Sequence, residues 1–413
     1  MRNIVFISSC ALDGAGVPDP FLLQELPWLR RHFDRVLLCS YYGVAELKED
    51  KPTTVAVRRP GFAAQRARVR ALFCLDFWRE LAHLRSDGKL TASSAAKLYL
   101  FTVRGYKLAL WTNRLLAGLR DDETTLYAYW MSYDGFAAAL CKRRHPRCRA
   151  IARGHAFDVD LSRNPMNPYL HKQFMLATLD GAYLISAYAK QRLLETLPRP
   201  MGKLHVVGLG SGGETLATRF PSPCSMDGVL RIVSCSAIIE IKQLPLLIDA
   251  IALLDDRDVR WTHIGGGADE QAVRRYAGQK LGSRLRVEYE LLGNLPNESV
   301  QQLYAAQPFD VFVNVSRMEG IPVSIMEAMC FGMPVVAPRV GGIPELVDDS
   351  VGFLYDPAGG AQAVADALNA VAELSADRAE RMREAAQTRW KERCRNETLL
   401  PLLFPAQKGE PDA

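Results

Sequence analysis

Two glutamates spaced eight residues apart, Glu319 and Glu327, lie beside a predicted helix start. Pro322 suits the first turn of that helix, because its missing N–H is not needed there. Free amides at such a start attract a phosphate. These amides belong to Gly320, Ile321, Val323 and Ser324. Two carboxylates would repel an anion unless they face its neutral hydroxyls, and a nucleotide-sugar offers both phosphate and hydroxyls.

A simpler interpretation of the two glutamates also has to be weighed. Glu319 could only complement the helix dipole, an effect of about 0.3–1 kcal/mol. Glu327 would then be a solvated helix residue, as most acidic side chains are. The glycines and prolines around the pair favour the ligand-binding interpretation.

The elements around the pair predict how it is positioned. Residues 311–315 form a short, β-branched apolar run typical of a buried strand. A polar turn over 316–320 follows, then a helix over 324–331 that Gly332 ends, and a strand over 334–338. This is one strand–turn–helix–strand unit of a parallel sheet, in which ligands bind beyond the carboxyl ends of the strands.

The stretch from residue 316 to 347 carries three motifs: S-x-x-E-G-x-P-x-x-x-x-E-A, G-x-P-V-V-A and G-G-I-P-E-L-V. Together they resemble the family 4 retaining glycosyltransferases of the bacterial polysaccharide type, whose hallmark is E-x7-E. The resemblance implies an α/β fold with two Rossmann-like parallel-sheet domains facing across a cleft, called GT-B. It further implies a retaining, metal-independent hexosyltransferase in which Glu327 binds the ribose and Glu319 the sugar.

Lys242 is expected to neutralise the leaving diphosphate, and the family usually places an arginine five residues before it. Here that position is Ala237. Losing one cation beside a developing phosphate charge can cost a few kcal/mol of transition-state stabilisation. Either another arginine substitutes, with Arg317, Arg339 and Arg153 as candidates, or activity is reduced.

A second candidate site follows the predicted strand over 149–153. His155 lies there beside a glycine, within an R-x-H-x-x-D segment that resembles bacterial polysaccharide glycosyltransferases. The resemblance makes His155 a catalytic contact to donor sugar or acceptor, and makes Arg153 and Asp158 acceptor-binding or orienting residues. A lone histidine is more often structural. Asp158 and Asp160 also form D-x-D, a metal motif of the other glycosyltransferase fold, but three residues are weak evidence and no metal is expected.

Three glycine-containing loops complete the candidate residues. The loop with Gly16 follows the first strand, and the resemblance places it at the donor. Leu292 lies where the family makes main-chain contacts to the base. Residues 208–213 match G-x-G-x-x-G, a dinucleotide fingerprint, but Pro221 and Pro223 interrupt the helix and second strand that this fingerprint requires.

The domain organisation follows from these elements. We expect an acceptor-side Rossmann-like domain over residues 1–207, a linker over 208–228 and a nucleotide-sugar-binding domain over 229–385. A C-terminal helix over 386–404 is expected to return to the first domain, and the polar tail 405–413 to be disordered.

Residues 58–120 differ in composition from the rest of the chain, since they combine arginines with aromatic residues in predicted helices. One interpretation is a surface for an anionic membrane or a lipid-linked acceptor. The other is a solvated charged face over ordinary core packing. The sequence alone does not decide between them.

Composition narrows the class of protein. The chain has 413 residues, enough for two domains, and a net charge of +5, too small to indicate nucleic acid. Nine cysteines without C-x-x-C spacing predict a reducing cytoplasm and no zinc site. No apolar run reaches the ~18–20 residues of a membrane span. We therefore expect a cytoplasmic protein, peripheral on the cytoplasmic membrane face, without a cofactor.

The expected partners are a nucleotide-sugar donor and a lipid-linked or oligosaccharide acceptor. Three other functions remain open. Ala237 favours a catalytically weakened GT-B protein that acts as a binding subunit. A nucleotide-sugar epimerase of related fold would isomerise the sugar without transferring it. A nicotinamide-dependent oxidoreductase would rest on residues 208–213 alone.

Overall fold

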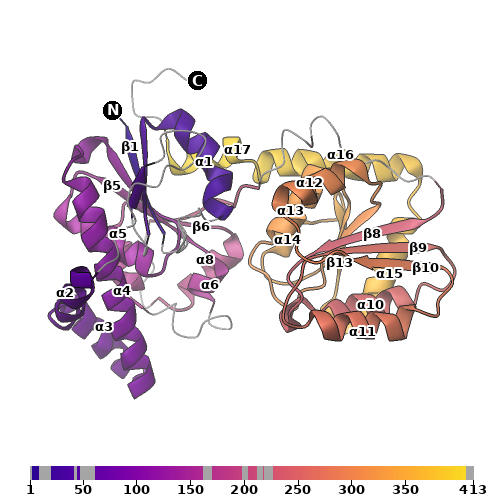
Figure 1. Cartoon of the computed structure of the whole chain (residues 1–413), viewed down its shortest axis with the longest axis horizontal. Helices are drawn as coiled ribbons and strands as arrows, with labels where there is room; N and C mark the ends of the chain where they lie inside the picture. The colour runs from indigo at the N-terminus through magenta and orange to yellow at the C-terminus, as the bar shows by residue number, and fades with distance from the viewer. Residues whose placement is uncertain are drawn as a thin grey trace. The chain divides into compact units, whose positions relative to one another are not determined.

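The computed structural model describes residues 2–8, 20–40, 44–46, 61–160, 170–197, 203–211, 217 and 227–405. The chain divides into two compact units, unit 1 over Met1–Gly208 and unit 2 over Leu209–Ala413. Each unit has its own sheet with helices packed on it (Figure 1). The predicted α/β class with two parallel-sheet domains is confirmed.

The sheet of unit 1 has the strand order β3-β2-β1-β4-β5-β6-β7. Its neighbours are parallel, apart from β3, which runs antiparallel to β2. All five residues of the central strand β1 are buried. The strands are β1 (Asn3–Ile7), β2 (Arg35–Cys39), β3 (Val44–Glu46), β4 (Thr124–Ala128), β5 (Arg149–Gly154), β6 (Gly181–Leu184) and β7 (Leu204–Val206).

The predicted helices within residues 58–120 are present as α2, α3 and α4. Thr91 caps α4, since its side chain accepts from the amide of Ser94 and the Ser94 hydroxyl accepts from the amide of Thr91. No helix in the described residues is long and apolar enough to cross a membrane. The helices are α1 (Pro20–His32), α2 (Gly61–Leu72), α3 (Leu75–Ser86), α4 (Ala92–Leu116), η1 (Asp121–Glu123), α5 (Tyr133–Arg144), α6 (Ala156–Val159), α7 (Lys172–Thr178) and α8 (Ala187–Leu194).

Unit 2 contains a parallel six-stranded sheet with the order β10-β9-β8-β11-β12-β13. The strands predicted over 311–315 and 334–338 are present as β11 and β12. This order is that of a doubly wound fold, and its direction reverses between β8 and β11, where such folds bind ligands. The strands are β8 (Leu230–Cys235), β9 (Val259–Ile264), β10 (Val287–Leu291), β11 (Val311–Val313), β12 (Val335–Pro338) and β13 (Gly352–Tyr355).

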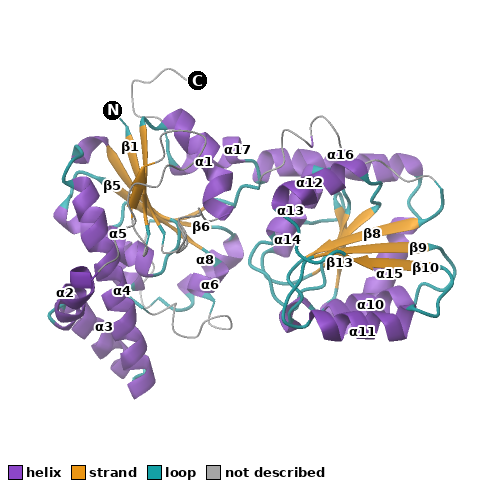
Figure 2. Ribbon diagram, viewed as in Figure 1, coloured by secondary structure: helices purple, strands orange, loops and turns teal. Residues whose placement is uncertain are grey.

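Helices cover both faces of this sheet, with α10 and α11 on one side and α12 and α13 on the other (Figure 2). The C-terminal stretch is two helices, because the chain leaves the helical conformation at Cys394; the expectation of one continuous helix was wrong there. The helices are η2 (Glu240–Lys242), α10 (Leu244–Ala252), α11 (Glu270–Leu281), α12 (Asn297–Ala306), α13 (Val323–Cys330), α14 (Ile343–Leu346), η3 (Pro357–Gly359), α15 (Gly360–Ala372), α16 (Ala376–Arg393) and α17 (Asn396–Leu403).

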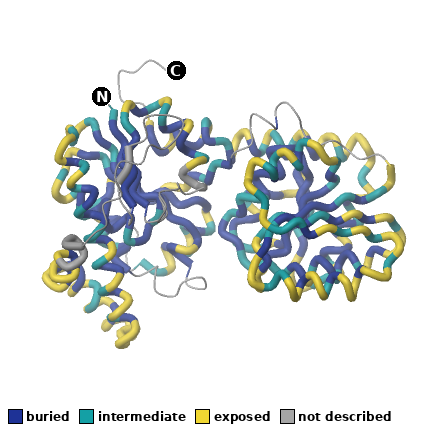
Figure 3. The backbone as a smooth tube through the Cα atoms, viewed as in Figure 1, coloured by how far each residue is buried: buried dark blue, intermediate teal, exposed yellow. Residues whose placement is uncertain are grey.

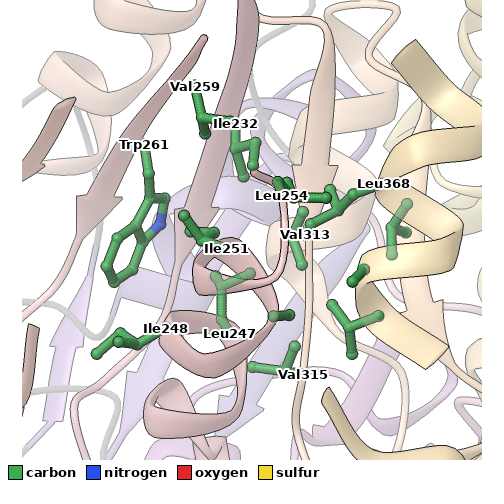
Figure 4. Close-up of a cluster of buried hydrophobic side chains, with 14 of the residues drawn as sticks. Ile232, Leu247, Ile248, Ile251, Leu254, Val259, Trp261, Val313, Val315 and Leu368 are labelled. Atoms are coloured by element: carbon green, nitrogen blue, oxygen red, sulfur yellow. The ribbon is translucent and has the colours of Figure 1, made fainter. Parts of the chain in front are cut away.

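The interior of each sheet is buried on both faces, as Figure 3 shows. In unit 2, Leu247 and Ile251 of α10 contribute to a core with Trp261 of β9 and Val313 of β11 (Figure 4). Each large apolar side chain removed from water contributes about 1.5–3 kcal/mol. This core fixes β8 and β11 side by side and so fixes the loops that leave their carboxyl ends.

Candidate functional site

The start and end of α13 are defined by its own residues. Pro322 is the N-cap, and the first amides that donate to it are those of Ile325 and Met326, so the amides of Val323 and Ser324 have no partner within the helix. At the other end, Gly332 adopts a left-handed backbone with φ 75°. Its amide donates to Met329 O and the next amide, of Met333, donates to Ala328 O. This is a Schellman motif, and the predicted helix end at Gly332 is confirmed.

A cavity of about 410 Å³ opens at the carboxyl ends of β8 and β11. It therefore lies at the switch point of the sheet, where the strand order predicts a ligand. Its lining includes six residues singled out in the sequence: Lys242, Glu319, Ile321, Pro322, Val323 and Ser324. The structure thus brings the predicted helix start, one of the two glutamates and the lysine around one space.

An ion pair crosses this cavity. Lys242 Nζ donates to Glu319 Oε1 over 2.5 Å, and both side chains are largely shielded from solvent. The two loops that carry them are joined by a backbone hydrogen bond from the amide of Arg317 to Ile241 O, 2.9 Å. Because an ammonium has three donors, Lys242 can keep Glu319 and still donate to a second acceptor in the cavity.

Two glycines hold the Glu319 loop in place. Gly341 has φ 54°, and a Cβ there would lie 1.8 Å from the carbonyl oxygen of Glu319. The amide of Gly342 donates to Gly320 O over 2.9 Å, and a Cβ on Gly342 would lie 2.1 Å from that oxygen. A side chain at either position would displace the backbone that carries Glu319. The G-G-I-P-E motif therefore positions the cavity without lining it.

Glu327 lies in α13, outside the lining of this cavity. It is 6% exposed, and its Oε1 accepts from Asn297 Nδ2 over 2.7 Å. Burial raises the pKa of Glu327, although the Asn297 hydrogen bond opposes this. Gly320 and Leu292 also lie outside the lining. The predicted contacts of these three residues to a nucleotide stay predictions.

Ala237 lines the cavity where the resemblance expects an arginine. The three candidate substitutes are placed elsewhere. Arg317 lies 3.3 Å from Glu240 in an exposed ion pair, and Arg339 is exposed and absent from the lining. Arg153 belongs to unit 1 and is fully buried. Among the described residues that line the cavity, Lys242 is the one cation.

Other residues lining the cavity were not singled out as polar contacts. Asn294 Oδ1 accepts from the amide of Gly266, which joins the loops after β9 and β10. Asn297, the partner of Glu327, begins α12 directly after a proline, and that position was the signal that could have identified it. Burial raises the pKa of the Cys235 thiol to about 12, so this cavity-lining cysteine is protonated at neutral pH and is no nucleophile.

In unit 1, His155 follows β5 at the carboxyl end of its sheet. It is 7% exposed, and its ring centroid lies 4.2 Å from that of Trp130 and 5.1 Å from that of Tyr129. Within the described residues neither ring nitrogen has a hydrogen-bond partner. Burial lowers the pKa of His155, so the imidazole is neutral at pH 7. The ring is therefore held between two tilted aromatic rings, with Nδ1 3.6 Å from Asp158 Oδ2.

Asp158 organises the backbone around this histidine. Its Oδ2 accepts from the amides of His155, 3.0 Å, and Met131, 3.2 Å. Lys172, which sequence reasoning missed, is 1% exposed and donates to Met131 O. Burial lowers the pKa of Lys172 to about 8, while the charges of Asp158 and Glu80 raise it. A lysine in an otherwise unremarkable stretch gave no sequence signal for this position.

Arg153 lies in a network buried within unit 1. Its Nη1 donates to Glu25 Oε1 over 2.8 Å, and Tyr127 Oη donates to Glu25 Oε2 over 3.0 Å. Its Nη2 donates to the carbonyl oxygens of Val207 and Gly208. These contacts tie α1, β4, β5 and the segment after β7 together. They occupy the guanidinium, and an acceptor contact through Arg153 stays a prediction.

The remaining sequence candidates have simple outcomes. Asp160 is buried and accepts from Tyr188 Oη over 2.7 Å. Within the described ranges, no three or more His, Cys, Asp or Glu side chains come together to hold a metal ion; metal independence stays a prediction. Gly16 lies outside the described residues. Of the residues in 208–213, Gly208–Ser211 are coil and the last two glycines also lie outside them.

Comparison with known families gives a match in unit 2. Residues 226–389 match the model of the family described as "Glycosyl transferases group 1". The chain is 31% identical over 264 residues to the protein of Escherichia coli named as colanic acid biosynthesis glycosyltransferase WcaL. It is 31% identical over 196 residues to amylovoran biosynthesis glycosyltransferase AmsK of Erwinia amylovora. The alignments cover 60% and 45% of this chain and 62% and 46% of the two relatives.

Solved structures resemble the whole chain. Anabaena HepE in complex with UDP has a TM-score of 0.64 and 16% identity, over 98% of both chains. Sucrose-phosphate synthase of Thermosynechococcus elongatus has a TM-score of 0.66 and 16% identity, again over 98% of both chains. At this identity the likeness is one of fold, and it confirms the predicted GT-B fold.

Proposed function

We propose that this chain, whose residues 226–389 belong to the group 1 glycosyl transferases, moves a sugar from a nucleotide-sugar donor to an acceptor hydroxyl. The observation that carries the proposal is the cavity at the switch point of unit 2, where a helix start and a single lysine meet Glu319. The names of WcaL and AmsK, both polysaccharide biosynthesis glycosyltransferases, support the same activity.

In this proposal the donor diphosphate lies at the start of α13. The free amides of Val323 and Ser324 and the ammonium of Lys242 stabilise the negative charge that grows on the departing diphosphate. Glu319 accepts from hydroxyls of the sugar, and its existing bond to Lys242 fixes the lysine before the donor arrives. The UDP in the HepE structure supports a nucleoside diphosphate as the ligand of this fold.

The role of Glu327 in the proposal is to hold the ribose. A buried carboxylate aligned by Asn297 costs stability while the site is empty. Two ribose hydroxyls would supply the donors that a buried carboxylate otherwise lacks. Asn297 would then orient Glu327, and it is the polar partner to test beside it.

We place the acceptor on unit 1, with His155 as the contacting side chain and Asp158 as the residue that orients it. Its ring nitrogens, which have no hydrogen-bond partner among the described residues, suit a neutral donor or acceptor of hydrogen bonds. We further propose retention of anomeric configuration, no metal or other cofactor, a lipid-linked oligosaccharide acceptor of surface polysaccharide, and a cytoplasmic reaction. The relatives' names support the polysaccharide, while retention rests on the family resemblance.

A second function is favoured by one observation: among the described residues that line the cavity, Ala237 stands where a second cation is expected. A GT-B protein that binds a nucleotide-sugar and transfers it poorly would act as a binding subunit. An epimerase is separated from both by its product, since it changes the sugar without releasing the nucleotide.

The test is release of nucleoside diphosphate from a panel of nucleotide-sugars, with and without a lipid-linked oligosaccharide acceptor. We expect release from one donor, an increase with acceptor, and loss of release in Lys242→Met. Proton NMR of the product should show the anomeric configuration of the donor. Binding without release would favour the binding subunit, and an isomerised, unreleased sugar would favour the epimerase.

A further inference from the structure

Unit 1 carries an exposed apolar surface around the junction of α2 and α3. Phe73 is 83% exposed and Leu75 is 70% exposed. Val69, Leu72 and Trp78 are each about half exposed. We call these five residues the junction surface. Its members fall within ten consecutive residues, and large contiguous apolar patches on a protein surface mark interaction sites.

The geometry of the junction keeps these side chains together. Trp78 Nε1 donates to Leu72 O over 2.8 Å, so the indole of α3 is held against the last residue of α2. Val69 and Leu72 are three residues apart in α2, as are Leu75 and Trp78 in α3, and residues at this spacing share a helix face. Ala71 and Cys74 between them are buried and anchor the junction to unit 1.

Positive charge surrounds this apolar surface. The described side chains of α2 include the exposed arginines Arg66, Arg68 and Arg70 and no acidic residue. The helix α3 carries two acidic residues. The carboxylate of Asp76 is buried and already paired with Arg79 and Arg143, and burial raises the pKa of the half-buried Glu80 to about 8, so it is mostly protonated at neutral pH. Figure 1 shows α2 and α3 beside α4 and away from the sheet of unit 1, so no element of the sheet covers them.

We propose that the junction surface and the arginines of α2 dock unit 1 on an anionic phospholipid bilayer. Phe73, Leu75 and Trp78 insert at the level of the headgroups, where tryptophan is enriched because one end of its ring is apolar and the other polar. The three arginines contact lipid phosphates while their aliphatic stems lie along the apolar boundary. A protein partner would not require cationic residues around the apolar centre, whereas an anionic bilayer does.

This docking would place unit 1 where a lipid-linked acceptor is embedded. It does not depend on the proposed sugar transfer, because lipid binding is measured without donor or acceptor. A negative result for lipid binding therefore does not argue against sugar transfer, and a negative result for sugar transfer does not argue against lipid binding.

The first experiment is flotation of the full chain with vesicles of phosphatidylcholine, alone or mixed with an equal part of phosphatidylglycerol. We expect binding to the anionic vesicles and little to the neutral ones. Replacing the three arginines (R66Q, R68Q, R70Q) should lower the partition coefficient on the order of 100-fold, since each basic residue contributes about fivefold. The matched control R275Q, R378Q and R381Q removes three exposed arginines of unit 2 and should bind like the wild type.

The second experiment tests the apolar contribution to binding with the double variant Phe73→Ser, Leu75→Ser. The control is Leu285→Ser, at a fully exposed leucine of unit 2. The double variant should lose binding and the control should keep it. Both change exposed side chains, so circular dichroism should show the same fold. The proposal is overturned when the double variant binds like the wild type, or when the wild type binds neutral vesicles equally well.

Tryptophan fluorescence gives an independent measurement of insertion. Of the six tryptophans, all within the described residues, Trp78 is the most exposed. Brominated anionic lipids should quench the fluorescence of the wild type and not that of Trp78→Phe. Unchanged quenching in Trp78→Phe would overturn the insertion of α3. Dimerisation in vesicle-free solution that is lost in the Phe73, Leu75 double variant would assign the junction surface to a second copy of the chain instead.

Discussion

The two units bury charge in different ways. In unit 2, Lys242 and Glu319 face each other across a cavity of about 410 Å³. In unit 1, Arg153 and Glu25 are nearly inaccessible, and the two Nη atoms of the guanidinium donate to a carboxylate and two backbone carbonyls. A charge beside open space is available to a ligand, while a buried charge paired with a carboxylate and backbone carbonyls holds elements together. We therefore expect the first pair to bind a ligand and the second to stabilise the fold.

The largest effect should come from breaking the buried pair. Arg153→Met leaves the Glu25 carboxylate buried without its guanidinium and should lower the free energy of unfolding by about 3–5 kcal/mol. Arg120→Met, which removes exposed pairs with Asp122 and Glu123, should leave the free energy of unfolding nearly unchanged. Urea unfolding of both variants makes the measurement.

The double variant Glu25→Met, Arg153→Met sharpens this test. Replacing both members of a buried ion pair by apolar residues is often neutral, so most of the loss should be recovered. If the Arg153→Met protein is as stable as the wild type, the Arg153–Glu25 pair does not stabilise the fold.

Breaking the ion pair between Lys242 and Glu319 should reduce activity more than stability. Lys242→Met removes the one cation in the described lining and should reduce sugar transfer by about 10²–10³-fold, or about 2.7–4 kcal/mol of activation free energy. Its thermal stability should change little, because the pair borders open space. Initial rates and melting temperatures distinguish the two effects. Loss of stability without loss of rate would place this pair with the structural one.

The buried lysine of unit 1 gives a pH-dependent test. Burial lowers the pKa of Lys172 from 10.5 to about 8, so the unfolded state binds this proton more tightly. Its contribution to stability is present above pH 10.5 and is lost as the pH falls through 8. The stability of the wild type relative to Lys172→Met should therefore rise by up to about 3 kcal/mol across this window. A pH-independent difference in unfolding midpoints would refute the burial argument.

A smaller gain is expected at the position of the missing arginine. Ala237→Arg adds a second cation to the exposed lining and should raise transfer by about tenfold, a part of what one such group contributes elsewhere. Ala237→Gln matches its polarity without the charge and should leave the rate unchanged. If both variants behave alike, Lys242 and the helix amides already suffice for the leaving group.

The smallest effect concerns Glu327. Burial raises its pKa above 4.5, so its contribution to stability is present below pH 4.5 and is lost as the pH rises through the folded value. Glu327→Gln keeps an acceptor for Asn297 without a charge. Its melting temperature relative to the wild type should increase from acid to neutral pH. A difference that falls with pH would mean that the carboxylate is stabilised, not penalised, in the empty site.

The sequence predicted the local features of the cavity in unit 2 better than the long-range contacts of unit 1. The Glu319 loop and the start of α13 lie within a few residues of each other, and their chemistry is visible as a local motif. The strands on either side of α13 were predicted because buried parallel strands are continuous apolar runs. Lys242 was identified through its place in the family pattern. The spacing of residues within short motifs therefore predicted most of the proposed donor site.

Long-range partners could not be predicted. Arg153 and Glu25 are 128 residues apart, and no periodicity indicates that they meet. Lys172 gave no motif, and the helix start at Asn297 did not indicate that its side chain meets Glu327. Glu327 kept its motif spacing, yet its burial and its absence from the cavity lining depend on the packing of α12 against it. The roles of these residues depend on tertiary contacts that the sequence does not reveal.

We propose that the cavity after β8 and β11 holds a nucleoside diphosphate. The most direct measurement is calorimetric titration of the folded protein with UDP and the other nucleoside diphosphates. At 100 times the dissociation constant, a true ligand also stabilises the fold by about 2.7 kcal/mol. We predict saturable binding of one diphosphate, weakened in Lys242→Met and Glu327→Ala and unchanged in the Phe73, Leu75 double variant. Absence of binding by any of them, or binding that neither site variant weakens, would contradict the account.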